Sequence, residues 1–123
     1  MGKDKIKWLD EPEQHDYPAA ESYLSLIFTV NKAESMARDL EFISDKISFK
    51  AKDIFRASGL PLLGLSNDHV ESNKDKIKEG KSLSPILLVR DEPNRKVIVA
   101  DGYHRLCAVY SIDEDSLIPC KII

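Results

Sequence analysis

Hydrophobic residues recur at helical spacing through two neighbouring segments near the start of the chain. The second segment carries one apolar stripe, formed by Ala33, Met36, Ala37, Leu40, Ile43 and Ile47. Ahead of the first segment, Asp16-Tyr17-Pro18 is typical of a helix start, because proline is favoured in the first turn. Asn31 is a plausible N-cap for the second helix. Residues 18–45 are therefore predicted to form a helical hairpin whose apolar faces rest on another part of the chain.

The middle of the chain predicts a short strand followed by a solvated helix. Partial alternation of apolar and polar residues indicates a strand over residues 47–53. A helix is predicted over residues 68–79, with Asn67 or Asp68 as its N-cap and Gly80 as its C-terminal stop. Most residues of this helix are polar, so we expect it to face solvent.

The last part of the chain predicts a β-hairpin, a helix and a final strand. The apolar stretches 86–89 and 97–100 flank a polar turn, which is typical of a hairpin. Residues 103–112 carry a helical pattern, and residues 117–123 are predicted to form a strand. This order of elements requires helices packed on a small mixed sheet, in an α+β or α/β domain.

Composition and charge narrow the class of protein. The chain has 123 residues, of which 42% are hydrophobic and 32% are charged, as in ordinary soluble domains. Its net charge of −3 argues against binding DNA mainly through phosphate charge. No apolar stretch is long enough to cross a membrane, and the start lacks the apolar core of a signal peptide. We therefore expect a cytoplasmic protein with no membrane contact, in which Cys107 and Cys120 are buried free thiols.

The stretch VIVADGYHRLCAVY combines a predicted strand and a predicted helix. Between them lie five residues of different chemistry, namely Asp101, Gly102, Tyr103, His104 and Arg105. A helix N-terminus attracts anions because its first amides have no partner within the helix. Gly102 leaves the backbone accessible, and His104 and Arg105 could neutralise a phosphate. The alternative is structural: Asp101 caps the helix, and Arg105 pairs with Asp101 or Asp113.

Residues 84–123 resemble the core of the ParB/sulfiredoxin-like superfamily. The resemblance rests on features in a fixed order: the strand start Pro85-Ile86, the hairpin, the Gly-x-His-Arg turn with its helix, and the closing strand at Ile118-Pro119. The predicted strand and helix that precede the hairpin fit the same order, so the resemblance extends over residues 46–123. It implies an α+β fold, with a small mixed sheet and packed helices. A tail and the helical hairpin over residues 1–45 lie outside it, and the whole chain is similar to small bacterial proteins with such a domain.

In sulfiredoxins, the matching turn holds a nucleotide phosphate and supplies the catalytic cysteine. Gly102, His104 and Arg105 match that turn, but Tyr103 stands in place of the cysteine, so we expect no sulfiredoxin activity. The preceding helix of sulfiredoxins also contacts the nucleotide. Its matching face here carries three polar residues at i, i+3 and i+7, of which Ser72 matches best and the others are plausible replacements, namely His69 and Lys76. A merely solvated helix face is the alternative.

In ParB proteins, the matching turn is Gly-Glu-Arg-Arg and binds a cytidine nucleotide. This chain keeps only the final arginine of that pattern, Arg105, and has no helix-turn-helix segment after it. We therefore expect neither DNA partitioning nor direct DNA binding. No cluster of acidic residues or histidines has a spacing that predicts a metal site.

Two hypotheses for function follow. The first is a protein that binds a nucleotide or another phosphate-containing small molecule. The nucleotide would be ATP or CTP together with Mg²⁺, and the reaction would be that of a nucleotide hydrolase or a phosphotransferase. Asp101 could then ligate the Mg²⁺ or orient a nucleophile. The second is a non-catalytic interaction module with a vestigial phosphate site, and a homodimer is its simplest form. Its partner would bind aromatic residues that could instead cover the core, namely Trp8, Tyr17, Tyr23 and Phe28.

Overall fold

The computed structural model describes residues 5–63 and 67–123 and has the expected α+β architecture. A four-stranded sheet has the strand order β2-β6-β4-β5. Its strands are β2 (Ile47–Lys50), β4 (Ile86–Asp91), β5 (Lys96–Asp101) and β6 (Leu117–Ile122). The central pair β4 and β6 is parallel, and the two outer pairs are antiparallel. This mixed sheet confirms the predicted fold class.

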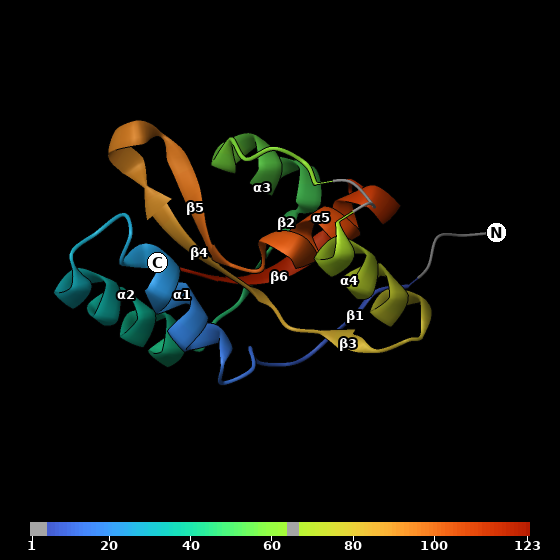
Figure 1. Ribbon diagram of the computed structural model, residues 1–123, viewed down its shortest axis with the longest axis horizontal. Helices are drawn as coiled ribbons and strands as arrows, with labels where there is room; N and C mark the ends of the chain where they lie inside the picture. Colours follow the sequence, from blue (N-terminus) through green and yellow to red (C-terminus); the bar gives the residue numbers. More distant parts are fainter. Residues whose placement is uncertain (1–4, 64–66) are drawn as a thin grey trace.

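Helices cover both faces of the sheet (Figure 1). One face carries α1 (Asp16–Leu24) and α2 (Val30–Phe42), and the other carries α3 (Ala51–Ser58), α4 (Asp68–Lys78) and α5 (Tyr103–Ile112). Successive side chains of β4 point to opposite faces of the sheet, so this one strand contributes to the hydrophobic core on each face. Leu87 and Val89 pack with α1 and α2, whereas Ile86 and Leu88 pack with the other helices.

The predicted helical hairpin is present, and its apolar side rests on the sheet. Ala33, Ala37 and Leu40 of the stripe are buried, but the stripe does not continue to Ile47, which lies in β2 and is exposed. The predicted cap of the second helix is wrong: its N-cap is Thr29, whose hydroxyl accepts a hydrogen bond from the amide of Lys32 at 3.3 Å. The helix begins earlier than predicted because Thr29 already has extended backbone angles and a capping side chain.

A buried lysine connects this helical hairpin to β6. The Lys121 side chain is 2% exposed and forms an ion pair with Glu11 at 3.2 Å. Its ammonium also donates to the hydroxyl of Tyr17 at 3.0 Å and to the carbonyl of Glu41 at 3.2 Å. Burial acts to lower the pKa of Lys121, but its bonds to Tyr17 and Glu11 outweigh burial and raise it. The lysine therefore stays charged and joins three elements of the fold.

Other predicted boundaries need smaller changes. The strand at residues 47–53 ends at Lys50, because α3 begins at Ala51. The helix at residues 68–79 is confirmed as α4, and the Oδ1 of Asn67 caps it by accepting from the amides of His69 and Val70. The β4–β5 hairpin is also confirmed; a 3₁₀ turn, η1 (Glu92–Asn94), joins its strands.

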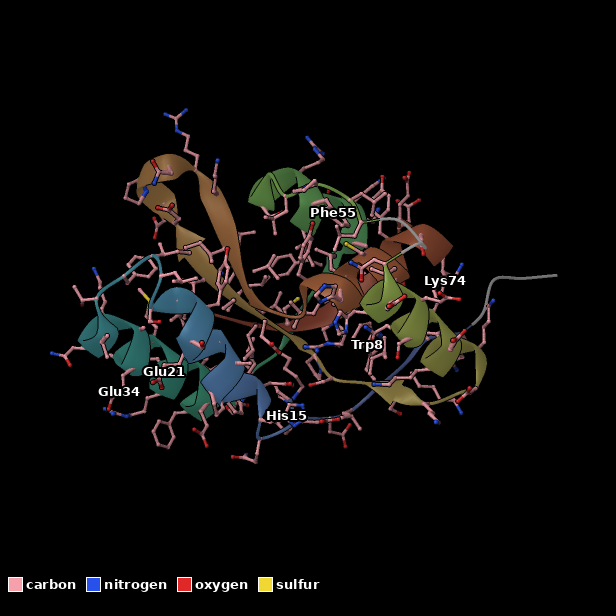
Figure 2. The ribbon with its side chains drawn as sticks, viewed as in Figure 1. Trp8, His15, Glu21, Glu34, Phe55 and Lys74 are labelled. Atoms are coloured by element: carbon pink, nitrogen blue, oxygen red, sulfur yellow. The ribbon has the colours of Figure 1, made fainter. Side chains whose placement is uncertain are left out.

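Two short strands attach the beginning of the chain to the rest. The strand β1 (Lys7–Trp8) pairs in parallel with β3 (Ser82–Leu83), and Trp8 packs against the core beneath α4 and α5 (Figure 2). Tyr17 is buried and Phe28 is partly buried, whereas Tyr23 is 40% exposed. Three of these aromatic residues thus cover the core. Both cysteines are buried and free, as predicted, and no helix in the described part of the chain could cross a membrane.

Candidate phosphate site at the start of α5

Gly102 makes the sharp connection between β5 and α5. Its φ is +110°, a value that residues with a side chain rarely adopt. A Cβ at this position would lie 2.8 Å from Cγ1 of Ile86 and 2.9 Å from Nη2 of Arg105. The glycine therefore allows both the backbone angle and the close packing. No side chain of the described residues caps α5, so the predicted capping role of Asp101 is not observed.

Arg105 is held by groups of its own chain. Its Nη2 donates to Oδ2 of Asp101 at 3.0 Å and to the carbonyl of Pro85 at 3.3 Å. The two charged side chains are only 16% and 17% exposed. The Nε of Arg105 is buried and has no hydrogen-bond partner within the described residues. The positive charge expected to attract phosphate is thus partly offset by Asp101, which was the structural alternative for this arginine.

A second carboxylate, Asp16 at the start of α1, reaches the same corner. Asp16 is buried, and its Oδ2 accepts hydrogen bonds from the Ser84 hydroxyl and, at 3.1 Å, from the Glu13 amide. His15, labelled in Figure 2, lies 3.4 Å from the other carboxylate oxygen of Asp16. Burial raises the pKa of Asp101, Arg105 opposes this change, and the neighbouring Asp16 raises the pKa further. The corner thus contains two neighbouring acidic groups, of which Asp101 pairs with Arg105.

Asp16 and Ser84 are the site residues that the sequence did not reveal. Asp16 was predicted only as a helix start, and Ser84 only marked the beginning of the superfamily resemblance. The two residues are 68 positions apart along the chain, and neither belongs to a motif. The sequence offered one hint for Asp16 alone: it begins a helix that must pack on the sheet.

Two histidines from neighbouring helices meet beside this turn. The ring centroids of His69 in α4 and His104 in α5 are 4.8 Å apart. Burial lowers the pKa of His104, and the nearby His69 and Arg105 lower it further. Near neutral pH, His104 is therefore a hydrogen-bonding group more than a cation. Tyr103 lies on the other side of His104, with ring centroids 5.7 Å apart, and its hydroxyl donates to the carbonyl of Pro61.

The remaining predicted residues of α4 do not join this cluster. Ser72 and Lys76 are exposed, and neither forms a hydrogen bond or ion pair with the turn among the residues that the structure describes. Helix geometry places Ser72 nearly opposite the buried side that carries Val70 and Ile77. The structure therefore brings His69 to residues 101–105 but leaves Ser72 and Lys76 facing solvent.

The carboxylates of this corner take part in hydrogen bonds of their own. The carboxylate of Asp101 already accepts from Arg105, and that of Asp16 accepts from Ser84. Over residues 5–63 and 67–123, no group of three or more His, Cys, Asp or Glu could hold a metal. A Mg²⁺ ion that arrives with a nucleotide needs only one or two protein carboxylates, since phosphate and water complete its coordination, so the predicted role of Asp101 toward it stays a prediction.

Comparison with known proteins adds no identity. No protein-family model, curated protein or solved structure matches this chain. The ParB/sulfiredoxin-like resemblance, and the division of the chain near residue 45 that it implies, stay predictions.

Proposed function

We propose that the protein binds a phosphate-bearing small molecule, such as a nucleotide, at the start of α5. The observation that carries this proposal is a helix of ten residues that begins on a closely packed glycine with no side-chain cap from a described residue. Such an end presents unpaired amides and the positive end of the helix dipole to an anion. The ring nitrogens of His69 and His104 supply further groups that can bond phosphate oxygens.

Arg105 supports the proposal, although a carboxylate restrains it. Both hydrogen bonds of its guanidinium in the structure come from Nη2, while Nε has no partner among the described atoms. An unpaired buried donor costs about 1–3 kcal/mol, and a phosphate oxygen would remove this cost if the guanidinium turned its Nε toward the ligand. Asp101 fixes the guanidinium beside the helix start, and it also competes with the anion.

This competition gives the sharpest test. The substitution Asp101→Asn removes the negative charge that competes with the anion for Arg105, so it should tighten phosphate binding by about tenfold, or 1.4 kcal/mol. Calorimetric titration with ATP, CTP and inorganic phosphate measures the affinity of wild type and variant. The matched control is Asp39→Asn on the exposed side of α2, which should leave the affinity unchanged.

Two outcomes separate the alternatives. Binding that tightens in Asp101→Asn and is lost in Arg105→Ala supports a phosphate site, provided that the variants keep the circular dichroism spectrum of the wild type. A ligand at a hundred times its Kd would also raise the free energy of unfolding by about 2.7 kcal/mol. If none of the three ligands binds wild type or Asp101→Asn at millimolar concentration, the proposal is rejected.

The second candidate is a non-catalytic interaction module whose phosphate site is vestigial. The pairing of Arg105 with Asp101, beside the buried Asp16, favours it, because these groups satisfy much of the corner internally. In that case the same variants change stability only. A surface for a second copy would include exposed apolar side chains around the α1–α2 connection, namely Tyr23, Leu26, Ile27 and Val30. Sedimentation equilibrium of wild type and Leu26→Ser measures whether such a dimer forms.

A further inference from the structure

A separate cavity of about 580 Å³ lies between α3 and the β4–β5 hairpin, elements that stand side by side in Figure 1. Its inner wall is apolar and comes from both the sheet and the helix, through Phe49, Ile54, Leu88, Val97 and Ile122. None of the residues of the candidate phosphate site lines it. Its volume lies within the roughly 300–1,000 Å³ typical of small-molecule sites.

The polar residues of this cavity carry a surplus of positive charge. Three cations line it, Arg90, Arg95 and Lys96, against two carboxylates, Asp53 and Glu92. The three cations are exposed, and none forms an ion pair with any residue of the described ranges. Asp53, in contrast, forms an ion pair with Arg56, which lies outside the cavity lining, at an N–O distance of 3.7 Å. Cations without partners beside an apolar wall favour a ligand with an anionic head.

The backbone of Arg95 adds a second observation. Arg95 has φ +55° and is the one non-glycine residue of the described chain with a positive φ. Glycine or asparagine adopts this conformation more readily than arginine. The chain thus keeps a long cationic side chain, facing the cavity, at a position where the backbone favours a smaller residue.

We infer that this cavity binds an amphipathic carboxylate, with an aliphatic or aromatic body and one negatively charged head. The body would lie against the apolar wall, where burial of apolar surface drives binding. The head would pair with Arg90, Arg95 or Lys96, since guanidinium groups match the geometry of a carboxylate. An anionic head fits the lining, because its three cations outnumber its two carboxylates, one of which is paired outside the lining.

Octanoate and octan-1-ol provide a matched pair of probes, because they share the chain and differ in the charged head. Calorimetry should show that octanoate binds at least about ten times more tightly than octan-1-ol, a difference of 1.4 kcal/mol. Raising the salt concentration should weaken the binding of octanoate and leave the binding of octan-1-ol unchanged. Equal affinities of the two probes would overturn the assignment of an anionic head.

Variants locate the binding. Ala57 is an exposed lining residue of α3, so Ala57→Trp should block the cavity without disturbing the core, and octanoate binding should be lost. Ala19→Trp, at an exposed position of α1, is the control and should bind as wild type does. Arg90→Gln should weaken octanoate about fivefold, whereas Arg56→Gln, outside the cavity lining, should have little effect.

The remaining outcomes are equally decisive. Octanoate that binds Ala57→Trp as tightly as wild type places its site elsewhere and overturns the inference. Failure of octanoate to bind wild type, together with a dimer that Ala57→Trp disrupts, would make a second copy the occupant and also overturn it. ATP titrated into Ala57→Trp should behave as with wild type, so the result is independent of the site at α5.

Discussion

Two regions of the molecule have arginines beside apolar side chains, and they differ in whether the arginine has an ion-pair partner. At the start of α5, Arg105 is mostly buried, and Asp101 and the carbonyl of Pro85 hold its Nη2. At the cavity beside α3, Arg90 and Arg95 are exposed and have no ion-pair partner in the described part of the chain. An internally paired cation contributes mainly to stability, whereas an unpaired one is available to a ligand. The region with the recognisable Gly-x-His-Arg pattern is thus the one whose charge is partly compensated within the chain.

The largest expected effect is on the backbone of the first region. Gly102→Ala combines an unfavourable φ of +110° with a Cβ that lies 2.8 Å from Cγ1 of Ile86. Each problem costs about 1–3 kcal/mol, so we expect a loss of about 3 kcal/mol in the free energy of unfolding, measured in urea.

Gly80→Ala is the control for this prediction, because φ is +76° but the nearest atom, Nζ of Lys7, would lie 3.9 Å from the new Cβ. Only the backbone strain applies there, at about 1 kcal/mol. Equal losses in the two variants would show that the turn at Gly102 is not closely packed.

Removing one arginine from each region tests the contrast directly. Arg105→Gln leaves Asp101 without its partner and should lower the free energy of unfolding by about 2 kcal/mol. This is less than the roughly 3–5 kcal/mol of a fully buried pair, because the side chains keep some exposure to solvent. Arg90→Gln should change stability by less than about 0.5 kcal/mol. Urea denaturation of the two variants measures the difference, and similar losses would remove the distinction between the regions.

The pH dependence of stability should differ between the wild type and the variant Asp101→Asn. Its pKa is raised above the ordinary value of 3.8, mainly by burial. The folded state therefore binds the proton more tightly than the unfolded state, and stability should fall as pH rises from below 3.8 through the raised pKa. Asp101→Asn lacks this component, so its advantage over wild type should grow across that interval. Unfolding free energies at several pH values check this, and parallel curves would contradict it.

The smallest effect is expected at the hairpin of the second region. Arg95→Gly relieves the positive φ of +55°, which is worth about 1 kcal/mol, while the freedom of glycine in the unfolded chain offsets about 0.5 kcal/mol. The net gain should be about 0.5 kcal/mol, accompanied by weaker octanoate binding. Asn94→Gly is the control and should lose stability, because it removes the hydrogen bond from Asn94 to Asp91 at 2.9 Å. Lower stability of Arg95→Gly would contradict the strain at this residue.

Local patterns predicted the elements of the fold better than the surroundings of either site. The cap of α4 at Asn67 and the breaks at Gly80 and Gly102 follow from residues next to one another in sequence. The cap of α2 was missed because Thr29 and Asn31 both suit a helix start, and only the observed backbone angles distinguish them.

Long-range placement was the harder part. The sulfiredoxin resemblance assigned His69 and His104 to one nucleotide site, and their rings lie close together, but the approach of Asp16 to the corner depends on how α1 packs on the sheet. No sequence pattern predicted the cavity, because its lining comes from α3, the η1 turn and all four strands of the larger sheet. Tertiary packing therefore determined which predicted groups are available and which are already paired.

The position of Asp16 links the helical hairpin to the turn at Gly102. Its carboxylate is buried against Ser84, so lifting α1 from the sheet breaks that bond and uncovers the corner that holds Asp101 and Arg105. Hydrogen exchange at the start of α5 should therefore follow the detachment of α1, because the same movement exposes both to water.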